Sequence, residues 1–267
     1  LIADRCTDKV DVYHISFGNI KGTRMYGVLT MPKKEGKYPS ILKVPGAGVH
    51  AMSGNVAWAA KGAIVLEIGI HGIPVILESG LYSDLSNGVL SNYVLHGIEN
   101  RDTYFFRRVY LGCVKAVDFL LSLPKSNGKV GVIGGSQGGM LSLATSYLDK
   151  RISATGVYFP AFCDQEAYMH GRTGGWPHFF KNKENCQKEY LETARYYDGA
   201  NFARKLTAPV YYAYGYNDIT CGPTTSSATY NAITAPKQVV IGANEGHWLF
   251  PEHINGMWEW MIKELTK

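Results

Sequence analysis

The ten residues from Gly131 to Met140 constrain the fold more than any other part of the sequence. They read Gly-Val-Ile-Gly-Gly-Ser-Gln-Gly-Gly-Met, an apolar strand-like run that enters a Gly-x-Ser-x-Gly turn and then a helical run to Leu148. A serine at such a corner is typical of the nucleophile elbow of serine hydrolases, and small neighbours are needed where the backbone folds back. The pattern predicts that Ser136 forms an acyl-enzyme. The alternative is a glycine-rich turn with an incidental serine.

Apolar strand-like runs alternate with helical patterns over most of the 267 residues. Ahead of them, Val10–Phe17 and Arg24–Met31 alternate in polarity and predict an antiparallel pair of strands. The other predicted strands are Ser40–Val44, Ala63–Ile68, Val130–Ile133, Ala154–Phe159, Val210–Tyr214 and Gln238–Ile241. Short apolar runs suit strands that are covered on both faces. We therefore expect an α/β fold, with a mostly parallel central sheet, antiparallel N-terminal strands and helices on both faces.

Helical periodicity is clearest from about Thr103 to Leu123, where the apolar residues share one face. Asp102 is the predicted N-cap of this helix, and Pro124 marks its stop. Another helix, near Ile254 to Leu265, closes the chain.

The alternation breaks over residues 161–204, a stretch with many aromatic side chains. Open α/β sheets place their ligands at the carboxyl ends of the strands. We therefore expect a single domain over residues 1–267, with a cap or insertion at 161–204 that covers those strand ends.

Composition narrows the classes of function. The formal net charge is +5, but the basic residues are scattered, whereas a nucleic-acid surface needs a basic stripe with interleaved aromatics. No segment has the length and continuous apolarity of a membrane span. The five cysteines are odd in number and form no Cys-x-x-Cys pair, which disfavours zinc and a disulfide framework but leaves a single disulfide open. We expect a soluble enzyme or binding protein with no metal, nucleic-acid or membrane partner.

The chain opens with Leu1 rather than methionine, as a processed protein or an excised domain does. The lack of a signal-like start therefore leaves the compartment, cytoplasmic or exported, open.

An elbow serine needs a base and an orienting carboxylate, which follow it in α/β-hydrolases in the order Ser, Asp or Glu, His. Imidazole accepts the serine proton near neutral pH, and the carboxylate holds its tautomer. Asp218 and His247 each lie in a loop directly after a predicted strand. Alone, Asp218 suits a cap for the helix near Pro223, and His253 is expected at the surface or as a cap. Three signals in the required order predict the triad Ser136, Asp218 and His247.

Two backbone N–H groups are expected to form an oxyanion hole. One belongs to Gln137, the residue after the nucleophile. The second is expected from the loop Pro45–Val49, where Ala47 is the best candidate. The alternative for this loop is simply a tight turn.

Several segments together resemble the acetyl xylan esterases of carbohydrate esterase family seven, which also contains cephalosporin-C deacetylases. They are Tyr104–Leu111, Gly134–Gly139, Asp218–Thr224 and Tyr230–Asn231. The likeness spans Gly27 to His247. It implies an α/β-hydrolase fold and the removal of acetyl groups from small or oligomeric sugars without metal or cofactor. It also implies a tendency to form homo-oligomers.

Two departures from the family pattern concern the walls of the site. The family usually has a tyrosine in the oxyanion loop, where this chain has Ala47. Its Arg-Gly-Gln-Gly motif is replaced here by Ile70-His-Gly-Ile73. These changes concern residues that would contact the substrate rather than the groups that carry out the reaction. His71 is an alternative base, but it precedes the serine, so we expect a structural role.

Three other functions fit parts of the sequence. Gly46 and Gly48 lie in a Gly-x-Gly-x-x-Ala match, and Glu67 ends the next predicted strand, as in a dinucleotide-binding protein. The aromatic residues of 161–204 suit a carbohydrate-binding module. A prolyl-oligopeptidase-like peptidase shares the triad order but normally brings a large extra domain. The intact triad favours a serine carboxylesterase.

Overall fold

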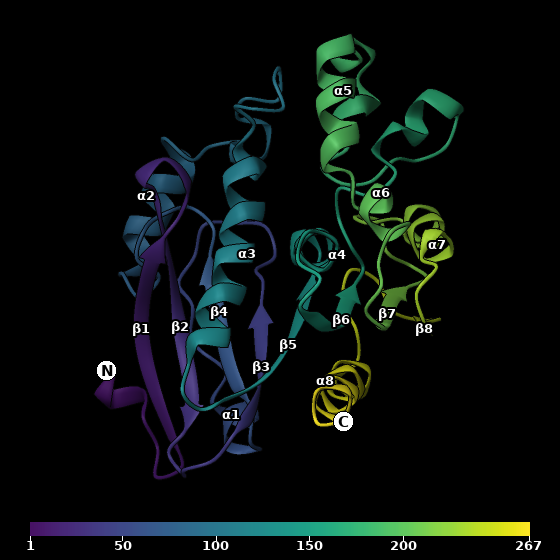
Figure 1. Cartoon of the computed structure of the whole chain (residues 1–267). Coiled ribbons are helices and arrows are strands. Elements are labelled where there is room, and N and C mark those ends of the chain that lie inside the picture. The colour runs from purple at the N-terminus through teal and green to yellow at the C-terminus, as the bar shows by residue number, and fades with distance from the viewer.

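The computed structural model describes all 267 residues, Leu1–Lys267, and is built around one eight-stranded sheet (Figure 1). Its strands are β1 (Val10–Gly18), β2 (Arg24–Pro32), β3 (Tyr38–Lys43), β4 (Ile64–Gly69), β5 (Ser126–Gly135), β6 (Ile152–Tyr158), β7 (Val210–Gly215) and β8 (Lys237–Gly242). They lie in the order β1-β2-β4-β3-β5-β6-β7-β8, antiparallel from β1 to β4 and parallel from β4 to β8. The predicted mostly parallel sheet with antiparallel N-terminal strands is confirmed.

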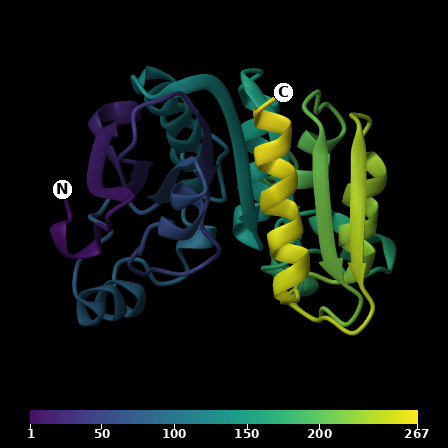
Figure 2. The same ribbon diagram turned by 90° about the horizontal axis from the view of Figure 1, so that it is seen from below.

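Helices cover both faces of the sheet, which explains the continuous apolar runs of its central strands. Leu42 and Val132 point into a core with α3 (Phe105–Ser122) and α4 (Gln137–Leu148), whereas their neighbours Ile41 and Ile133 point to the opposite face. That second face is covered by α1 (Val56–Ala60) and α8 (Pro251–Leu265). Successive residues of a strand point to opposite faces, so both must be apolar here. Figure 2 shows α8 lying over the sheet, with the N-terminal and C-terminal strands at opposite edges.

The start of α3 differs from the prediction. The helix begins at Phe105 with Tyr104 in the N-cap position, so the assignment of Asp102 as N-cap is wrong. The chain turns just before the helix, where the N–H groups of Thr103 and Tyr104 both donate to the carbonyl of Asn100. Asp102 lies within this turn, largely exposed, with its carboxylate 3.7 Å from the Arg107 guanidinium.

Residues 161–204 connect β6 to β7 and contain no strand. They form three short 3-10 turns followed by α5 (Lys188–Tyr197) and α6 (Gly199–Ala203). Figure 1 places this segment beyond the carboxyl ends of β6 and β7. The remaining helices are α2 (Ser79–Asn87) and α7 (Pro223–Ala232).

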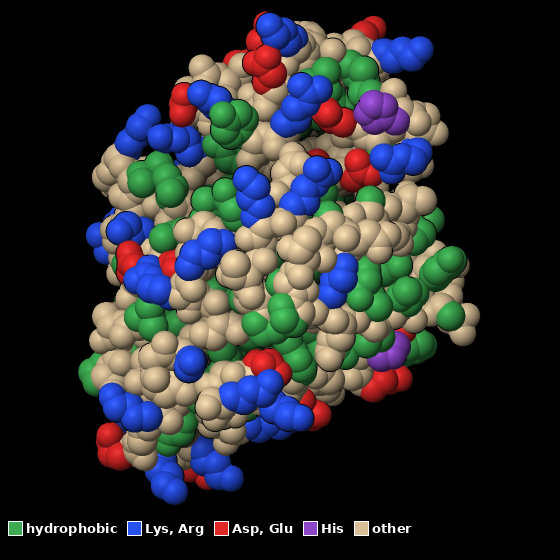
Figure 3. Space-filling model, turned by 45° about the vertical axis from the view of Figure 1, so that its right-hand side comes forward, with side chains coloured by type: hydrophobic (Ala, Val, Ile, Leu, Met, Phe, Trp, Pro, Cys, Tyr) green, Lys and Arg blue, Asp and Glu red, His purple; other side chains and the backbone are tan.

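Basic side chains are dispersed over the face shown in Figure 3, among hydrophobic, acidic and uncharged ones. Each of the five cysteines is a free thiol. No helix combines the length and apolarity needed to cross a membrane.

Candidate active site

Ser136 occupies the corner between β5 and α4 in a strained backbone conformation. Its φ is 56° and its ψ is −123°, outside the regions that residues with a side chain favour. Such a conformation costs about 1–3 kcal/mol and persists only when the surroundings impose it. Here the Ser136 N–H donates to the Tyr158 carbonyl at 3.1 Å, and the Ser136 carbonyl accepts from the Ala161 N–H at 2.9 Å. The corner is therefore held by the last residue of β6 and by the segment that follows this strand.

Two glycines allow the backbone to fold back at this corner. A Cβ on Gly134 would lie 2.6 Å from the carbonyl oxygen of Gly138. A Cβ on Gly138 would lie 2.5 Å from the carbonyl oxygen of Val44, at the end of the neighbouring strand. These distances are too short for a real side chain, which accounts for the small residues around the serine.

Replacing Gly138 with alanine is expected to lower the free energy of unfolding by about 1–3 kcal/mol, because the added methyl overpacks a rigid contact. Urea unfolding followed by circular dichroism measures this change. Gly80→Ala in α2 is the matched control, since a Cβ there meets no atom within 4 Å. Equal stability of Gly138→Ala and the wild type would contradict the contact.

The structure brings Ser136, His247 and Asp218 into one hydrogen-bonded chain. His247 Nε2 lies 3.0 Å from Ser136 Oγ, and His247 Nδ1 lies 2.8 Å from Asp218 Oδ2. Asp218 follows β7 and its side chain is 0 % exposed, whereas the His247 side chain, after β8, is 28 % exposed. The second carboxylate oxygen, Oδ1, accepts the N–H groups of Thr220 and Cys221, each at 2.8 Å. This arrangement can pass a proton from the hydroxyl to the imidazole while the carboxylate holds the ring.

The loop that carries His247 is braced by Glu245, which sequence reasoning missed. The Glu245 side chain is 1 % exposed, and its Oε2 accepts the Phe250 N–H at 2.9 Å. Its Oε1 lies 2.7 Å from Nδ1 of His253, so His253 is a half-buried partner of Glu245 rather than a free surface residue. The Asn217 N–H also donates to the Glu245 carbonyl at 2.9 Å, which joins this loop to that of Asp218. No spacing of residues in the sequence predicts these contacts of Glu245.

The predicted oxyanion-hole residues lie on adjoining segments, since Gln137 begins α4 and Ala47 lies in the loop after β3. The Ala47 N–H donates to no other backbone group, and the Gln137 N–H, at the first position of α4, has no hydrogen-bond partner within the helix. The Gln137 side chain is fully buried and donates from Nε2 to the Gly46 carbonyl at 3.1 Å. Both backbone donors therefore remain available beside the elbow.

His71 and Glu67 both have structural partners. They are therefore not free to act as a catalytic base and a ribose-binding acid, respectively. His71 donates from Nε2 to the Gly48 carbonyl at 2.9 Å, and burial lowers its pKa to about 4. Glu67 pairs with Lys43 at 2.5 Å and accepts the Gly54 N–H at 2.9 Å. Moreover, the next helix after the glycine loop begins only at Val56. The dinucleotide alternative thus lacks both a helix N-terminus for phosphate and a free ribose-binding acid.

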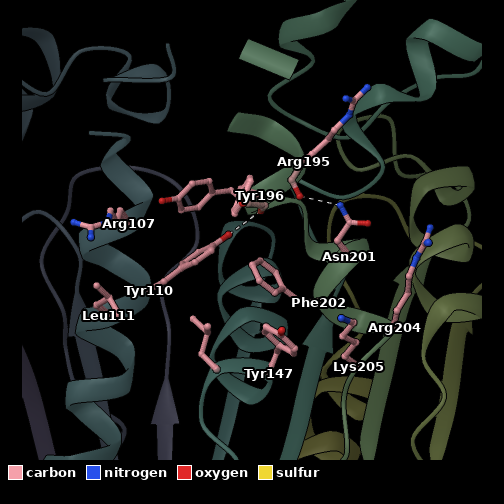
Figure 4. A pocket seen from close by; sticks show the side chains of 12 residues that line it. Arg107, Tyr110, Leu111, Tyr147, Arg195, Tyr196, Asn201, Phe202, Arg204 and Lys205 are labelled. Carbon is pink, nitrogen blue, oxygen red and sulfur yellow. Dashed lines mark hydrogen bonds between the residues drawn. The ribbon is translucent and has the colours of Figure 1, made fainter. Parts of the chain in front are cut away.

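A cavity of about 530 Å³ adjoins Ser136. Its wall includes the rings of Trp58, Phe159 and Trp258 and the Lys43–Glu67 ion pair. A larger cavity of about 790 Å³ lies between α3, α4 and α6, where Tyr110, Tyr147 and Phe202 line it (Figure 4). None of the three hydrogen-bonded residues lines that larger cavity, whereas Ser136 lines the smaller one.

Comparison with known proteins gives a consistent family. The acetyl xylan esterase (AXE1) family model matches residues 2–264. The acetyl esterase Axe7A of Xylanibacter ruminicola is 40% identical over 265 residues, which cover 97% of this chain and 60% of that protein. The chain thus spans about 60% of the length of this relative.

Solved structures agree with the family and the fold. An acetyl xylan esterase from Paenibacillus sp. R4 is 28% identical with a TM-score of 0.80, covering 95% of this chain and 84% of that chain. Acetyl xylan esterase 1 from Thermoanaerobacterium sp. JW/SL YS485 has a TM-score of 0.82 at 22% identity, covering 97% of this chain and 85% of that chain. The predicted α/β-hydrolase fold is confirmed, and the chain belongs to the acetyl xylan esterase family.

Proposed function

We propose that this protein is a serine carboxylesterase that removes acetyl groups from acetylated sugars through an acyl-enzyme on Ser136. The observation that carries the proposal is the hydrogen-bonded chain from Ser136 Oγ through His247 to Asp218. The 40% identity to an acetyl esterase supports the choice of acetyl as the acyl group.

The mechanism follows from the positions of these groups. His247 Nε2 takes the proton of Ser136 as Oγ attacks the ester carbonyl, and Asp218 stabilises the imidazolium that forms. The N–H groups of Gln137 and Ala47 stabilise the oxyanion of the tetrahedral intermediate. His247 then protonates the departing alcohol, and a water molecule activated by the same imidazole releases acetate. No step requires a metal or a cofactor.

The cavity beside Ser136 suits a sugar as the alcohol. Phe159, which is half-buried, contributes aromatic surface to its wall, whereas Trp58 and Trp258 are 7 % and 4 % exposed and stack on each other with their ring centroids 5.1 Å apart. Lys43 is 38 % exposed and can hydrogen-bond sugar hydroxyls. A polar and aromatic cavity of this size accommodates far more than an acetyl group.

Residues 161–204 are proposed to cap this site within a single domain. The Ala161 N–H donates to the Ser136 carbonyl, which ties the start of the segment to the elbow. Phe162 then packs edge to face against Trp176 at 5.3 Å between ring centroids. The first residue of the segment is therefore hydrogen-bonded to the backbone of the proposed nucleophile.

A panel of p-nitrophenyl esters of rising acyl length, assayed beside acetylated xylo-oligosaccharides, tests the proposal. We expect kcat/KM to be highest for p-nitrophenyl acetate and to fall as the acyl chain grows. We also expect the enzyme to release acetate from the oligosaccharides. p-Nitroacetanilide is the matched amide, and its slow hydrolysis would separate an esterase from a peptidase. Preference for long acyl chains would overturn the deacetylase assignment while leaving the triad intact.

A further inference from the structure

Consecutive peptide groups around Ala47 are each held by a different side chain. The Gly46 carbonyl accepts from Gln137 Nε2 at 3.1 Å. The Gly48 N–H donates to the Tyr93 hydroxyl at 3.0 Å, and the Gly48 carbonyl accepts from His71 Nε2 at 2.9 Å. Three side chains from separate parts of the sequence therefore fix the loop after β3 on both sides of Ala47.

These contacts set the direction of the Ala47 N–H. In a trans peptide group the C=O and the N–H point in opposite directions, so holding the Gly46 carbonyl fixes where the Ala47 N–H points. The loop has little stiffness of its own, because glycines flank Ala47 and Gly48 has a φ of +119°. The methyl side chain of Ala47 cannot donate a hydrogen bond. Stabilisation of an oxyanion from this loop thus depends on a backbone group that other residues must aim.

Tyr93 connects the two halves of the oxyanion hole. Its hydroxyl accepts from the Gly48 N–H and donates to Gln137 Oε1 at 2.8 Å, which leaves Gln137 Nε2 to face the Gly46 carbonyl. Tyr93 is 6 % exposed, and burial raises its pKa, so the hydroxyl keeps the proton that it donates. Gln137 also supplies the other backbone donor. A single hydrogen-bonded network therefore spans both donors.

We propose that Tyr93 and the Gln137 side chain, assisted by His71, are positioning residues that aim the Ala47 N–H at the oxyanion of the transition state. The inference rests on the proposed esterase function and extends it to residues that do not touch the reacting atoms. Loss of the positioning contacts should raise the free energy of the transition state, because a misdirected donor weakens binding of the oxyanion. Binding of the neutral ester should remain largely unchanged.

Tyr93→Phe and Gln137→Met test the network with p-nitrophenyl acetate. Deleting an oxyanion-hole donor outright costs about 100- to 1,000-fold in kcat, so loosening one is expected to lower kcat by about 10- to 100-fold with little change in KM. The inhibition constant of a small trifluoromethyl ketone, which adds to the serine as a tetrahedral oxyanion, should rise by the same factor as kcat/KM falls. The double variant should lose little more than the worse single variant, because both changes break one network.

Tyr212→Phe is the matched control, since Tyr212 is a fully buried tyrosine whose hydroxyl donates to the Ser226 carbonyl at 3.0 Å, in another part of the fold. It should keep wild-type kcat and ketone affinity. Thermal melting establishes that each variant is folded, and Gln137→Met alone decides the question where Tyr93→Phe does not fold.

Folded variants with wild-type kcat and ketone affinity would overturn the positioning role. The positioning role would also be overturned if activity fell only through a higher KM or a lower melting temperature while the ketone affinity stayed unchanged. If the wild type itself hydrolyses no ester, the proposed function fails instead, so the two failures are distinguishable.

Discussion

Replacing Ser136 with alanine is expected to reduce kcat for p-nitrophenyl acetate by about 10⁶-fold, the scale observed when a triad serine is removed. The hydroxyl is the atom that forms the acyl-enzyme, and no other hydroxyl donates to or accepts from His247 Nε2 in the structure. The oxyanion donors would remain and leave a small rate above that of water. Steady-state kinetics on protein free of host esterases measures the loss.

Covalent labelling gives an independent reading of the same residue. A fluorophosphonate should add one equivalent to the wild type at Ser136, located by peptide mass spectrometry, and none to Ser136→Ala. Ser142→Ala is the matched control. Ser142 is a buried serine of α4, and its hydroxyl donates to the Gly138 carbonyl at 2.9 Å. Retention of wild-type hydrolysis by purified Ser136→Ala would refute the nucleophile assignment.

Features with a local physical cause were predictable from the sequence. The glycines around Ser136 are required by backbone contacts within a few residues and with the adjacent strand, so they appear as a contiguous motif. The strands appear because burial on both faces demands apolar residues at successive positions. The proximity of Asp218 and His247 was predictable from their order along the chain and their place after strands, because the carboxyl ends of parallel strands meet at one edge of the sheet.

Contacts between distant segments were not predictable where the residues belong to no motif and no fixed chain order. Tyr93 meets Gln137 across 44 residues of sequence and begins a short 3-10 helix, Tyr93–Leu95, that carries no motif of its own. Glu245 braces the His247 loop through backbone groups, which carry no sequence signature. The assignment of Asp102 as an N-cap was wrong for a local reason. The residue type was right for a cap, but a turn through Asn100 delays the start of the helix.

Replacing Asp218 with asparagine is expected to lower kcat/KM by about 10⁴-fold near neutral pH, although the side chain keeps its shape. The direction of the amide decides the effect. Oδ1 of Asp218 accepts two backbone N–H groups, from Thr220 and Cys221, so the amide oxygen of asparagine must stay on that side. Its NH₂ group then faces His247 Nδ1, where the carboxylate oxygen now lies at 2.8 Å.

A donor at that position reverses the tautomer of His247. Nδ1 must then accept, so the single ring proton moves to Nε2, which points at Ser136 Oγ from 3.0 Å. An Nε2–H cannot take the serine proton, and general-base catalysis is lost while the geometry survives. Nitrogen-15 NMR of the labelled imidazole should show protonation move from Nδ1 to Nε2. Asp149→Asn, at a buried aspartate paired with Arg151, is the control and should keep wild-type kcat. A kcat/KM for Asp218→Asn within about tenfold of the wild type would mean that Asp218 does not set the tautomer, because the tautomeric effect on a triad is far larger than that.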